Sequence, residues 1–222
     1  VYKRQKVNLI RIESDFLKPS EIKNKLRGVS GILIPGGFGK RGTEGKIAAI
    51  NYARLNKIPF LGICFGMQMA VIEFARNKLN IKKATSSEFG PSKASVVGLM
   101  SEWTKDGKLM KGTDKDLGGT MRLGSYEARL KKDTKISKIY NKLKIQERHR
   151  HRYEFNSNYL SQMKLNGMNI VGFSEDKNLV EAIELKAHKW FVGCQFHPEF
   201  TSDPRIGHPL FNGFIKAAKV RK

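Results

Sequence analysis

Cysteines and acidic side chains are scarce in this chain. Its 222 residues hold two cysteines, Cys64 and Cys194, and 20 Asp and Glu against 42 Lys and Arg, which gives a formal net charge of +22. Two thiols in a chain of this length exclude a disulfide scaffold and favour a reducing compartment. With neither a long uncharged apolar run nor a signal-peptide pattern, we expect no membrane span and a cytoplasmic location.

The large positive charge raises the question of a nucleic-acid partner. Residues 129–152 alone hold ten Lys and Arg against Asp133 and Glu147, and such runs can bind phosphate. The cations are nevertheless scattered over most of the chain, and aromatic residues do not alternate with them as on a base-stacking platform. A solvated basic surface is therefore favoured, and a nucleic-acid-binding module stays as the alternative from another functional class.

Strand-like and helix-like segments alternate in the first half of the chain. After residue 64, Met67, Ala70, Val71 and Phe74 fall on one helical face. In chain order we expect a strand at 7–12, a helix at 20–26 capped by Ser20, a strand at 31–34, a helix at 44–56, a strand at 58–63 and the helix that carries Met67. This order predicts a parallel sheet with right-handed crossovers.

The second half shows a different pattern. We expect short strands and turns over 95–130, a helix at 136–141, strands at 171–174, 180–185 and 190–196, and a closing helix at 209–219. The three later strands are expected to pair antiparallel at the far side of the sheet. No repeat, low-complexity segment or linker divides the chain, and 40% hydrophobic residues suffice for one α/β core.

The stretch GICFG places Cys64 between Gly62 and Gly66, at the point where a strand becomes a helix. This is the pattern of a nucleophile elbow, whose tight turn exposes the nucleophile at the carboxyl end of the sheet. The N-terminus of the next helix would favour the thiolate, and the N–H of Phe65 would face an oxyanion. A buried cysteine in a glycine turn is the plainer alternative, and Cys194, inside an apolar strand, is expected to be core.

A thiolate nucleophile needs a proton partner, and the chain offers five histidines. In QFHPEF, His197 and Glu199 lie two residues apart, which puts both side chains on one side of an extended backbone. The carboxylate could then fix the tautomer of the imidazole. His149 and His151 in RHRHR could share a metal, but the flanking arginines repel a cation, so we expect no metal and favour an arginine clamp for a carboxylate.

Several longer motifs carry a resemblance. PGGFGKRGTEGK, LGICFGMQ, SSEFG, LGGTMRLG, ERHRHRYEFN and CQFHPEFTSDPRIGHPLF are similar to the class I glutamine amidotransferase domain of the CTP synthase family, over nearly the whole chain from about residue 7. The elbow and HPE motifs are typical of class I amidotransferases in general, whereas LGGTMRLG and RHRHRYEFN are typical of CTP synthases. Other elbow-cysteine hydrolases, such as γ-glutamyl hydrolases and peptidases, share the thiol chemistry but have no reason to carry these two motifs.

The resemblance implies roles for individual residues. Cys64 would be the nucleophile with His197 and Glu199 as its partners, and the N–H groups of Gly37 and Phe65 would form the oxyanion hole. The residues implied to hold the glutamine substrate are Gly37, Phe65, Gly66, Met67, Gln68, Glu88 and Arg152. An acidic and a basic side chain can bind the α-ammonium and the α-carboxylate of glutamine.

The resemblance also implies a reaction and its partners. Cys64 would form a γ-glutamyl thioester and release ammonia, which an N-terminal synthetase domain would use, with ATP and Mg²⁺, to aminate UTP to CTP in pyrimidine nucleotide biosynthesis. GTP would activate the hydrolysis, and Arg41 in the loop 40–43 is our candidate for its contact. The domain itself would need no cofactor, and the full-length enzyme would be a homotetramer.

The implied fold is a flavodoxin-like α/β domain at residues 7–222, with a mostly parallel central sheet flanked by helices. Its first strand and helix, and the synthetase domain, are expected to be missing. Neighbouring strands would then have unpaired backbone groups, so we expect the chain to aggregate readily. Val1–Gln5 fit no family motif, and residues 1–6 are expected to be a non-native or disordered start.

Overall fold

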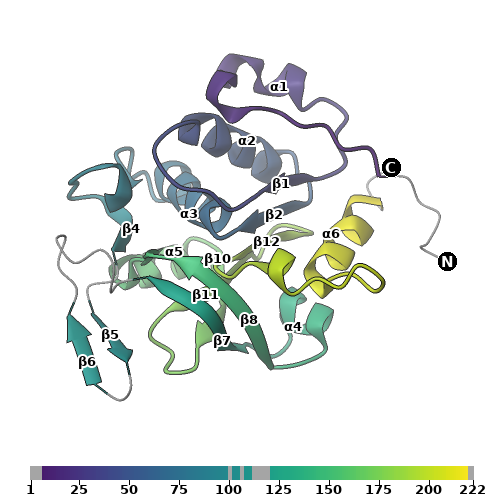
Figure 1. The fold of residues 1–222 in the computed structure, drawn as a ribbon. Coiled ribbons are helices and arrows are strands. Elements are labelled where there is room, and N and C mark those ends of the chain that lie inside the picture. Colours follow the sequence, from purple (N-terminus) through teal and green to yellow (C-terminus); the bar gives the residue numbers. More distant parts are fainter. Residues whose placement is uncertain (1–6, 100–101, 106–107, 112–120, 220–222) are drawn as a thin grey trace.

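The computed structural model describes residues 7–99, 102–105, 108–111 and 121–219. A seven-stranded sheet lies at its centre, in the order β1–β2–β12–β11–β10–β7–β8 (Figure 1). Its strands are β1 (Ile32–Ile34), β2 (Phe60–Ile63), β7 (Arg122–Leu130), β8 (Lys144–His151), β10 (Met168–Ser174), β11 (Val180–Leu185) and β12 (Phe191–Cys194). Two smaller sheets are also described. One has three strands in the order β3 (Thr85–Ser86), β4 (Ser95–Leu99) and β9 (Tyr153–Phe155), and the other pairs β5 (Glu102–Lys105) with β6 (Lys108–Lys111).

The central sheet is mixed. β1 and β12 both pair parallel with β2, whereas the other neighbours in the sheet pair antiparallel. The α/β class is confirmed, but the expectation of a mostly parallel sheet is wrong for the described strands. One reason is that β10 and β11 are joined by the short segment 175–179, which cannot hold the crossover that parallel strands need. The strand expected at 190–196 is β12, and its expected place at the far side is wrong: it lies inside the sheet, parallel to β2 and antiparallel to β11.

Helices cover both faces of this sheet (Figure 1). One face packs against α2 (Thr43–Leu55) and α3 (Phe65–Lys78), and there the rings of Phe60 and Phe191 stack with centroids 4.4 Å apart. The other face packs Leu61 and Val192 against α4 (Lys135–Tyr140) and α6 (Pro209–Lys219). The alternation of side chains along β2 and β12 therefore supplies both cores.

The remaining described helices are short. They are α1 (Ile22–Lys25), α5 (Leu160–Leu165) and the 3₁₀ turns η2 (Ser14–Phe16), η3 (Pro19–Glu21), η4 (Ser87–Phe89), η5 (Ser157–Tyr159) and η6 (Pro198–Phe200). Across the described ranges, no helix combines the length and the apolar character that crossing a bilayer requires.

Three local expectations need correction. Residues 7–13 form no strand, and the side chains of Leu9 and Ile10 are exposed, because no described strand pairs with this segment. The helix expected at 20–26 begins as η3 and continues as α1, so Ser20 lies inside the turn and caps neither element. The sequence did not predict three of the observed elements, which are β8, β9 and α5. Residues 1–6, and the 116–120 part of DLGGTMRLG, lie outside the described residues.

Candidate active site

Cys64 lies in the turn between β2 and α3, in a backbone conformation that few residues other than glycine adopt. Its φ is 51° and its ψ is −102°, and such strain is typical of functional sites. The glycines make the turn possible: a Cβ at Gly62 would lie 2.7 Å from the backbone of Gly66, and a Cβ at Gly66 would overlap the carbonyl oxygen of Ile34. The turn therefore has the elbow geometry that GICFG predicts.

The Cys64 thiol is buried, and burial raises its pKa to about 12. The N–H of Phe65 and the amide of Gln195, whose Nε2 lies 3.7 Å from Sγ, act in the opposite direction, while the carboxylates of Glu154 and Glu199 raise the pKa further. The N–H of Phe65 favours the thiolate, as expected, but burial acts more strongly in favour of the thiol. A nucleophilic role requires a base that removes the proton during the reaction.

A histidine follows the neighbouring strand. β12 pairs parallel with β2, so His197 and Cys64 leave the sheet at the same edge. Nδ1 of His197 lies 2.6 Å from Oε1 of Glu199. Burial acts against it, but the hydrogen bond and charge of His197 lower the pKa of Glu199 and keep it ionised. Nδ1 donates to this carboxylate, so Nε2 is the acceptor in the neutral ring, and this buried Nε2 has no hydrogen-bond partner among the described residues.

The PGGFG loop lies against both the elbow and the histidine. A Cβ at Gly36 would lie 2.8 Å from Cε1 of His197, and a Cβ at Gly37 would lie 3.6 Å from Cδ1 of Phe65. The loop and the first residue of α3 are thus side by side next to Cys64. An oxyanion hole built from two backbone N–H groups requires this proximity.

Two of the residues implied to hold glutamine already make structural hydrogen bonds. Oε1 of Glu88 accepts from the N–H of Gly39 at 2.6 Å, and burial raises the pKa of Glu88 while this bond lowers it. Nε2 of Gln68 donates to the carbonyl oxygen of Tyr153 at 2.9 Å. Gln68 therefore fixes the chain next to Arg152, which is half-buried between β8 and β9.

Met67 and Gly66 differ from these residues. The side chain of Met67 is fully buried in the core, where its Cγ would lie 2.8 Å from a Cβ placed on Gly193. Gly66 has no side chain. If either residue contacts a substrate, it does so through its backbone.

Comparison with known proteins decides the family. Residues 1–217 match the family described as glutamine amidotransferase class-I. The chain belongs to this family. Two similar curated proteins are the CTP synthase of Pelagibacter ubique (strain HTCC1062), 66% identical over 98% of this chain, and that of Rhizobium johnstonii (strain DSM 114642 / LMG 32736 / 3841), 55% identical over 97% of it. The chain spans 40% of the length of each of these relatives.

A solved structure extends this similarity to the coordinates. The glutaminase domain of Trypanosoma brucei CTPS with bound acivicin is 34% identical, with a TM-score of 0.87, over 99% of this chain and 83% of that one. The fold of this class I amidotransferase is therefore that of a CTP synthase glutaminase domain.

Arg41, the candidate GTP contact of this amidotransferase, lies in the loop before α2. It forms an ion pair with Asp15, and its side chain is 83% exposed. A second contact joins η2 to α2: Nζ of Lys46 donates to Oγ of Ser14 at 2.7 Å. η2 and the Arg41 loop are thus joined by side chains.

A buried charged cluster lies near the site, and it was not predicted from the sequence. Arg122 of β7 lies 2.7 Å from Oε1 of Glu181 and 3.4 Å from Oε1 of Glu154. His149 and His151 complete it, with their rings joined by a 2.9 Å contact from Nδ1 to Nε2. All five side chains are buried, and such a cluster is tolerated because its members pair with one another.

This cluster changes the interpretation of RHRHR. Along β8, His149 and His151 point inward and Arg148 and Arg150 outward. Burial, followed by the charge of Arg122, lowers the pKa of both histidines, so they are neutral. In the described part of the chain, no group of three or more His, Cys, Asp or Glu side chains has the arrangement of a metal site. Arg152, beyond the strand, is the arginine of the motif that remains as a candidate carboxylate clamp.

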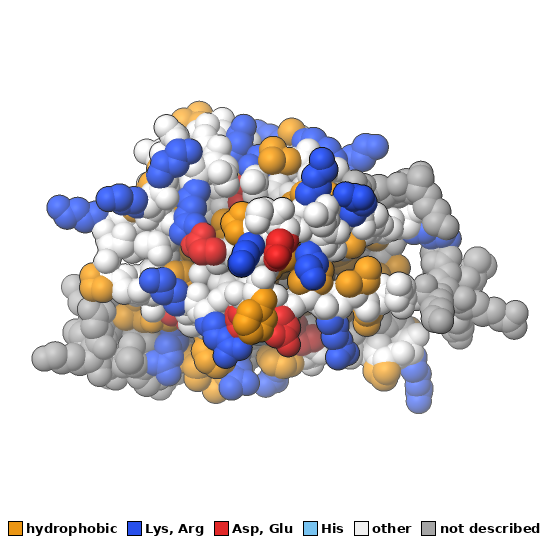
Figure 2. Space-filling model, turned by 90° about the horizontal axis from the view of Figure 1, so that it is seen from above, with side chains coloured by type: hydrophobic (Ala, Val, Ile, Leu, Met, Phe, Trp, Pro, Cys, Tyr) orange, Lys and Arg blue, Asp and Glu red, His pale blue; other side chains and the backbone are white. Residues whose placement is uncertain are grey.

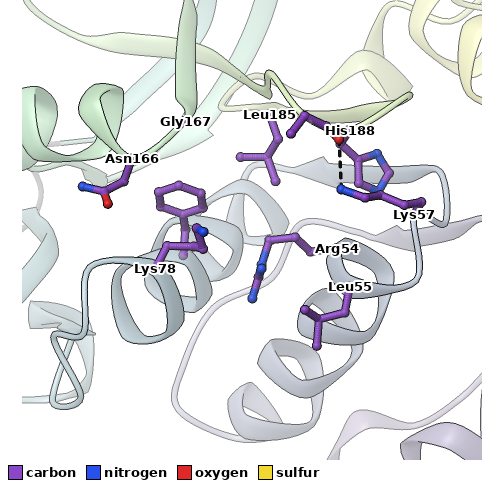
Figure 3. Close-up of a pocket in the computed structure, with 10 residues that line it drawn as sticks. Arg54, Leu55, Lys57, Lys78, Asn166, Gly167, Leu185 and His188 are labelled. Atoms are coloured by element: carbon purple, nitrogen blue, oxygen red, sulfur yellow. Dashed lines mark hydrogen bonds between the residues drawn. The ribbon is translucent and has the colours of Figure 1, made fainter.

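A pocket of about 190 Å³ lies elsewhere in the amidotransferase (Figure 3). Lys57 precedes β2 and His188 precedes β12, so the pocket is at the edge of the sheet opposite to Cys64. Nζ of Lys57 donates to the carbonyl oxygen of Ala187 at 2.9 Å across its rim. The pocket therefore contains none of the proposed catalytic residues.

The positive charge is dispersed over the face of the molecule that Figure 2 shows. Figure 2 shows Lys and Arg side chains spread over the face seen there, with a few acidic side chains among them. This distribution fits the solvated basic surface favoured from the sequence better than a continuous phosphate-binding patch.

Proposed function

We propose that this domain is the glutaminase of a CTP synthase, which hydrolyses L-glutamine through a Cys64–His197–Glu199 triad and supplies ammonia for the ATP-dependent amination of UTP to CTP. One observation carries the proposal: an elbow thiol and a carboxylate-oriented imidazole leave adjacent parallel strands at one edge of the sheet. The similarity to CTP synthases supports the identity of the products.

The first step is attack by sulfur. Nε2 of His197 accepts the thiol proton as Sγ of Cys64 attacks the side-chain amide carbon of glutamine. Proton transfer accompanies the attack, because a free thiolate is disfavoured where the pKa of the thiol is about 12. The negative charge that develops on the substrate oxygen is stabilised by the N–H groups of Gly37 and Phe65, and Glu199 stabilises the imidazolium.

The second step breaks the carbon–nitrogen bond. His197 returns its proton to the leaving nitrogen, ammonia departs, and a γ-glutamyl thioester remains on Cys64. Water then gives a proton to Nε2 as it attacks the thioester, so that glutamate leaves and the thiol is restored. In balance, glutamine and water give glutamate and ammonia.

Glutamine is held by its charged ends. The carboxylate of Glu88 would bind the α-ammonium and the guanidinium of Arg152 the α-carboxylate. The hydrogen bond from Gly39 occupies only Oε1 of Glu88, and a carboxylate can accept several bonds, so substrate binding does not require its release. The hydrogen bond from Gln68 to the carbonyl oxygen of Tyr153 holds the backbone next to Arg152 in place.

The wider assignments follow from the family. Residues 7–222 form one amidotransferase domain, and a synthetase domain with UTP, ATP and Mg²⁺ receives the ammonia. The full-length enzyme is a cytoplasmic homotetramer that GTP activates. Arg41 is the proposed GTP contact, because its exposed guanidinium could exchange Asp15 for a phosphate group.

The test compares the two cysteines in the complete gene product that carries this chain. Cys64→Ala should abolish glutamate release from glutamine, whereas CTP formation from free ammonia and UTP should continue. Cys194→Ala is the matched control, because its thiol is buried in β12 and points into the core. Retained glutaminase activity in Cys64→Ala would refute the triad, and failure to make CTP from ammonia would refute the synthase assignment.

A further inference from the structure

One buried carboxylate joins three parts of the chain beside the site. Glu147 of β8 is 3% exposed. Its Oε1 accepts from the hydroxyl of Tyr140 at 2.7 Å and contacts Nε2 of His208 at 2.8 Å. Its Oε2 accepts from the hydroxyl of Thr201 at 2.7 Å. The carboxylate thus links the end of α4, the start of α6 and the segment after η6.

The partners of this carboxylate act as hydrogen-bond donors. Nδ1 of His208 accepts from the N–H of Leu210 at 3.2 Å, so the proton of a neutral ring is on Nε2. Tyr140 and Thr201 can both donate as hydroxyls. Three donors therefore converge on one carboxylate, and removing it would take away the acceptor that all three share.

Thr201 is the last residue of the turn that carries the catalytic pair. The N–H of Thr201 donates to the carbonyl oxygen of Pro198 at 3.3 Å, and the N–H of Phe200 donates to that of His197 at 3.1 Å. At the other end, the N–H of His197 donates to the carbonyl oxygen of Arg148 at 2.8 Å. Successive residues of β8 therefore hold both ends of the turn.

The turn needs this support because burial immobilises only its first part: His197 and Pro198 are buried, whereas the residues that follow them are not. The side chain of Glu199 is 40% exposed, and Phe200, whose ring stacks on His197 at 4.9 Å, is 49% exposed. The Nδ1–Oε1 contact of 2.6 Å is thus set mainly by the backbone of the turn. Errors of about 1 Å in such groups can cost 10²-fold in rate.

We propose that Glu147 is a positioning residue for glutamine hydrolysis: its hydrogen bond to Thr201 holds the turn that presents His197 and Glu199. The inference rests on the proposed function. Glu147 touches no reacting atom and acts through Thr201.

The experiment removes the donors on the two sides of the carboxylate separately, in the complete gene product. Thr201→Val removes the donor on the His197 side, and Tyr140→Phe, the matched control, removes the donor on the α4 side. We expect Thr201→Val to lower kcat for glutamine hydrolysis by about tenfold or more with KM nearly unchanged, since it affects the transition state. Thr201→Ser should restore the rate, and Tyr140→Phe should keep the wild-type rate even where its melting temperature falls.

A double-mutant cycle separates positioning from stability. In a Glu199→Gln background, Thr201→Val should cost much less than in the wild type, because both changes weaken one unit. An unaffected kcat in Thr201→Val, or an equal loss in Tyr140→Phe, overturns the inference while leaving the proposed function intact. A wild-type protein that releases no glutamate refutes the proposed function itself.

Discussion

Cys64 and His197 leave one edge of the sheet but are held there by different means. At the elbow, backbone packs against backbone, so closely that no side chain fits between Gly66 and the carbonyl oxygen of Ile34. At the His197 turn, the holding contacts are hydrogen bonds to β8, centred on the Glu147 carboxylate. The elbow is therefore sensitive to added volume, and the turn to the loss of polar groups.

Apart from the loss of the nucleophile itself, the largest effect is expected from the turn. His197→Ala should slow glutamine hydrolysis by roughly 10² to 10⁴-fold, because the acid–base group is lost. Glu199→Gln should cost less, because the imidazole remains and loses only its orienting charge. Steady-state glutamate release measures both variants. Wild-type rates in His197→Ala would show that another base serves Cys64.

The next effect concerns the elbow. Gly66→Ala places a methyl group on a backbone carbonyl that cannot rotate away, so we expect a loss of about 3 kcal/mol in the free energy of unfolding. Gly28→Ala is the control, because alanine there meets only the strain of a positive φ, +77°, and nothing lies within 4 Å of its Cβ position. That variant should lose only about 1 kcal/mol. Denaturant unfolding that gives equal losses would show that the elbow is not tightly packed.

A smaller effect is expected from alkaline pH. Burial raises the pKa of the Cys64 thiol from 9.0 to about 12, so between these values the folded chain holds a proton that the unfolded chain has lost. The resulting stability is present below pH 9 and is lost as the pH rises toward 12.

This loss can be isolated by comparison with Cys64→Ala. The wild type should lose about 1–4 kcal/mol relative to the variant between pH 9 and 12, whereas the difference should be constant below pH 8. Unfolding curves of both proteins over this range provide the measurement. A difference that stays flat to pH 12 would show that the thiol is not desolvated.

The elbow and the turn also differ in how far sequence reveals them. GICFG is local: two glycines around a cysteine between an apolar strand and a helix define the turn without reference to the rest of the chain. The positions of α2, α3 and α6 are likewise predicted from local sequence. The order of strands does not, because the position of β12 beside β2 depends on which edges are free once the earlier strands have paired.

β8 shows why the support of the turn escapes sequence reasoning. Its inward positions after Ile145 are Glu147, His149 and His151, so polar residues occupy places where an apolar pattern would signal a half-buried strand. Their burial depends on partners from distant segments: Tyr140, Thr201 and His208 for Glu147, and the Arg122 cluster for the two histidines. From the sequence alone, His149 and His151 in RHRHR therefore look like residues of an exposed strand, because their buried partners come from other segments.

Direct detection of the thioester tests the central claim most sharply. The complete gene product is mixed with glutamine, quenched in acid during turnover, and examined by intact-mass and peptide mass spectrometry. A glutamyl adduct should be found on the peptide that contains Cys64, and none on the peptide that contains Cys194 or on the Cys64→Ala variant. Rapid glutamate release without any adduct on Cys64, in a protein whose Cys64→Ala variant remains active, would contradict the account.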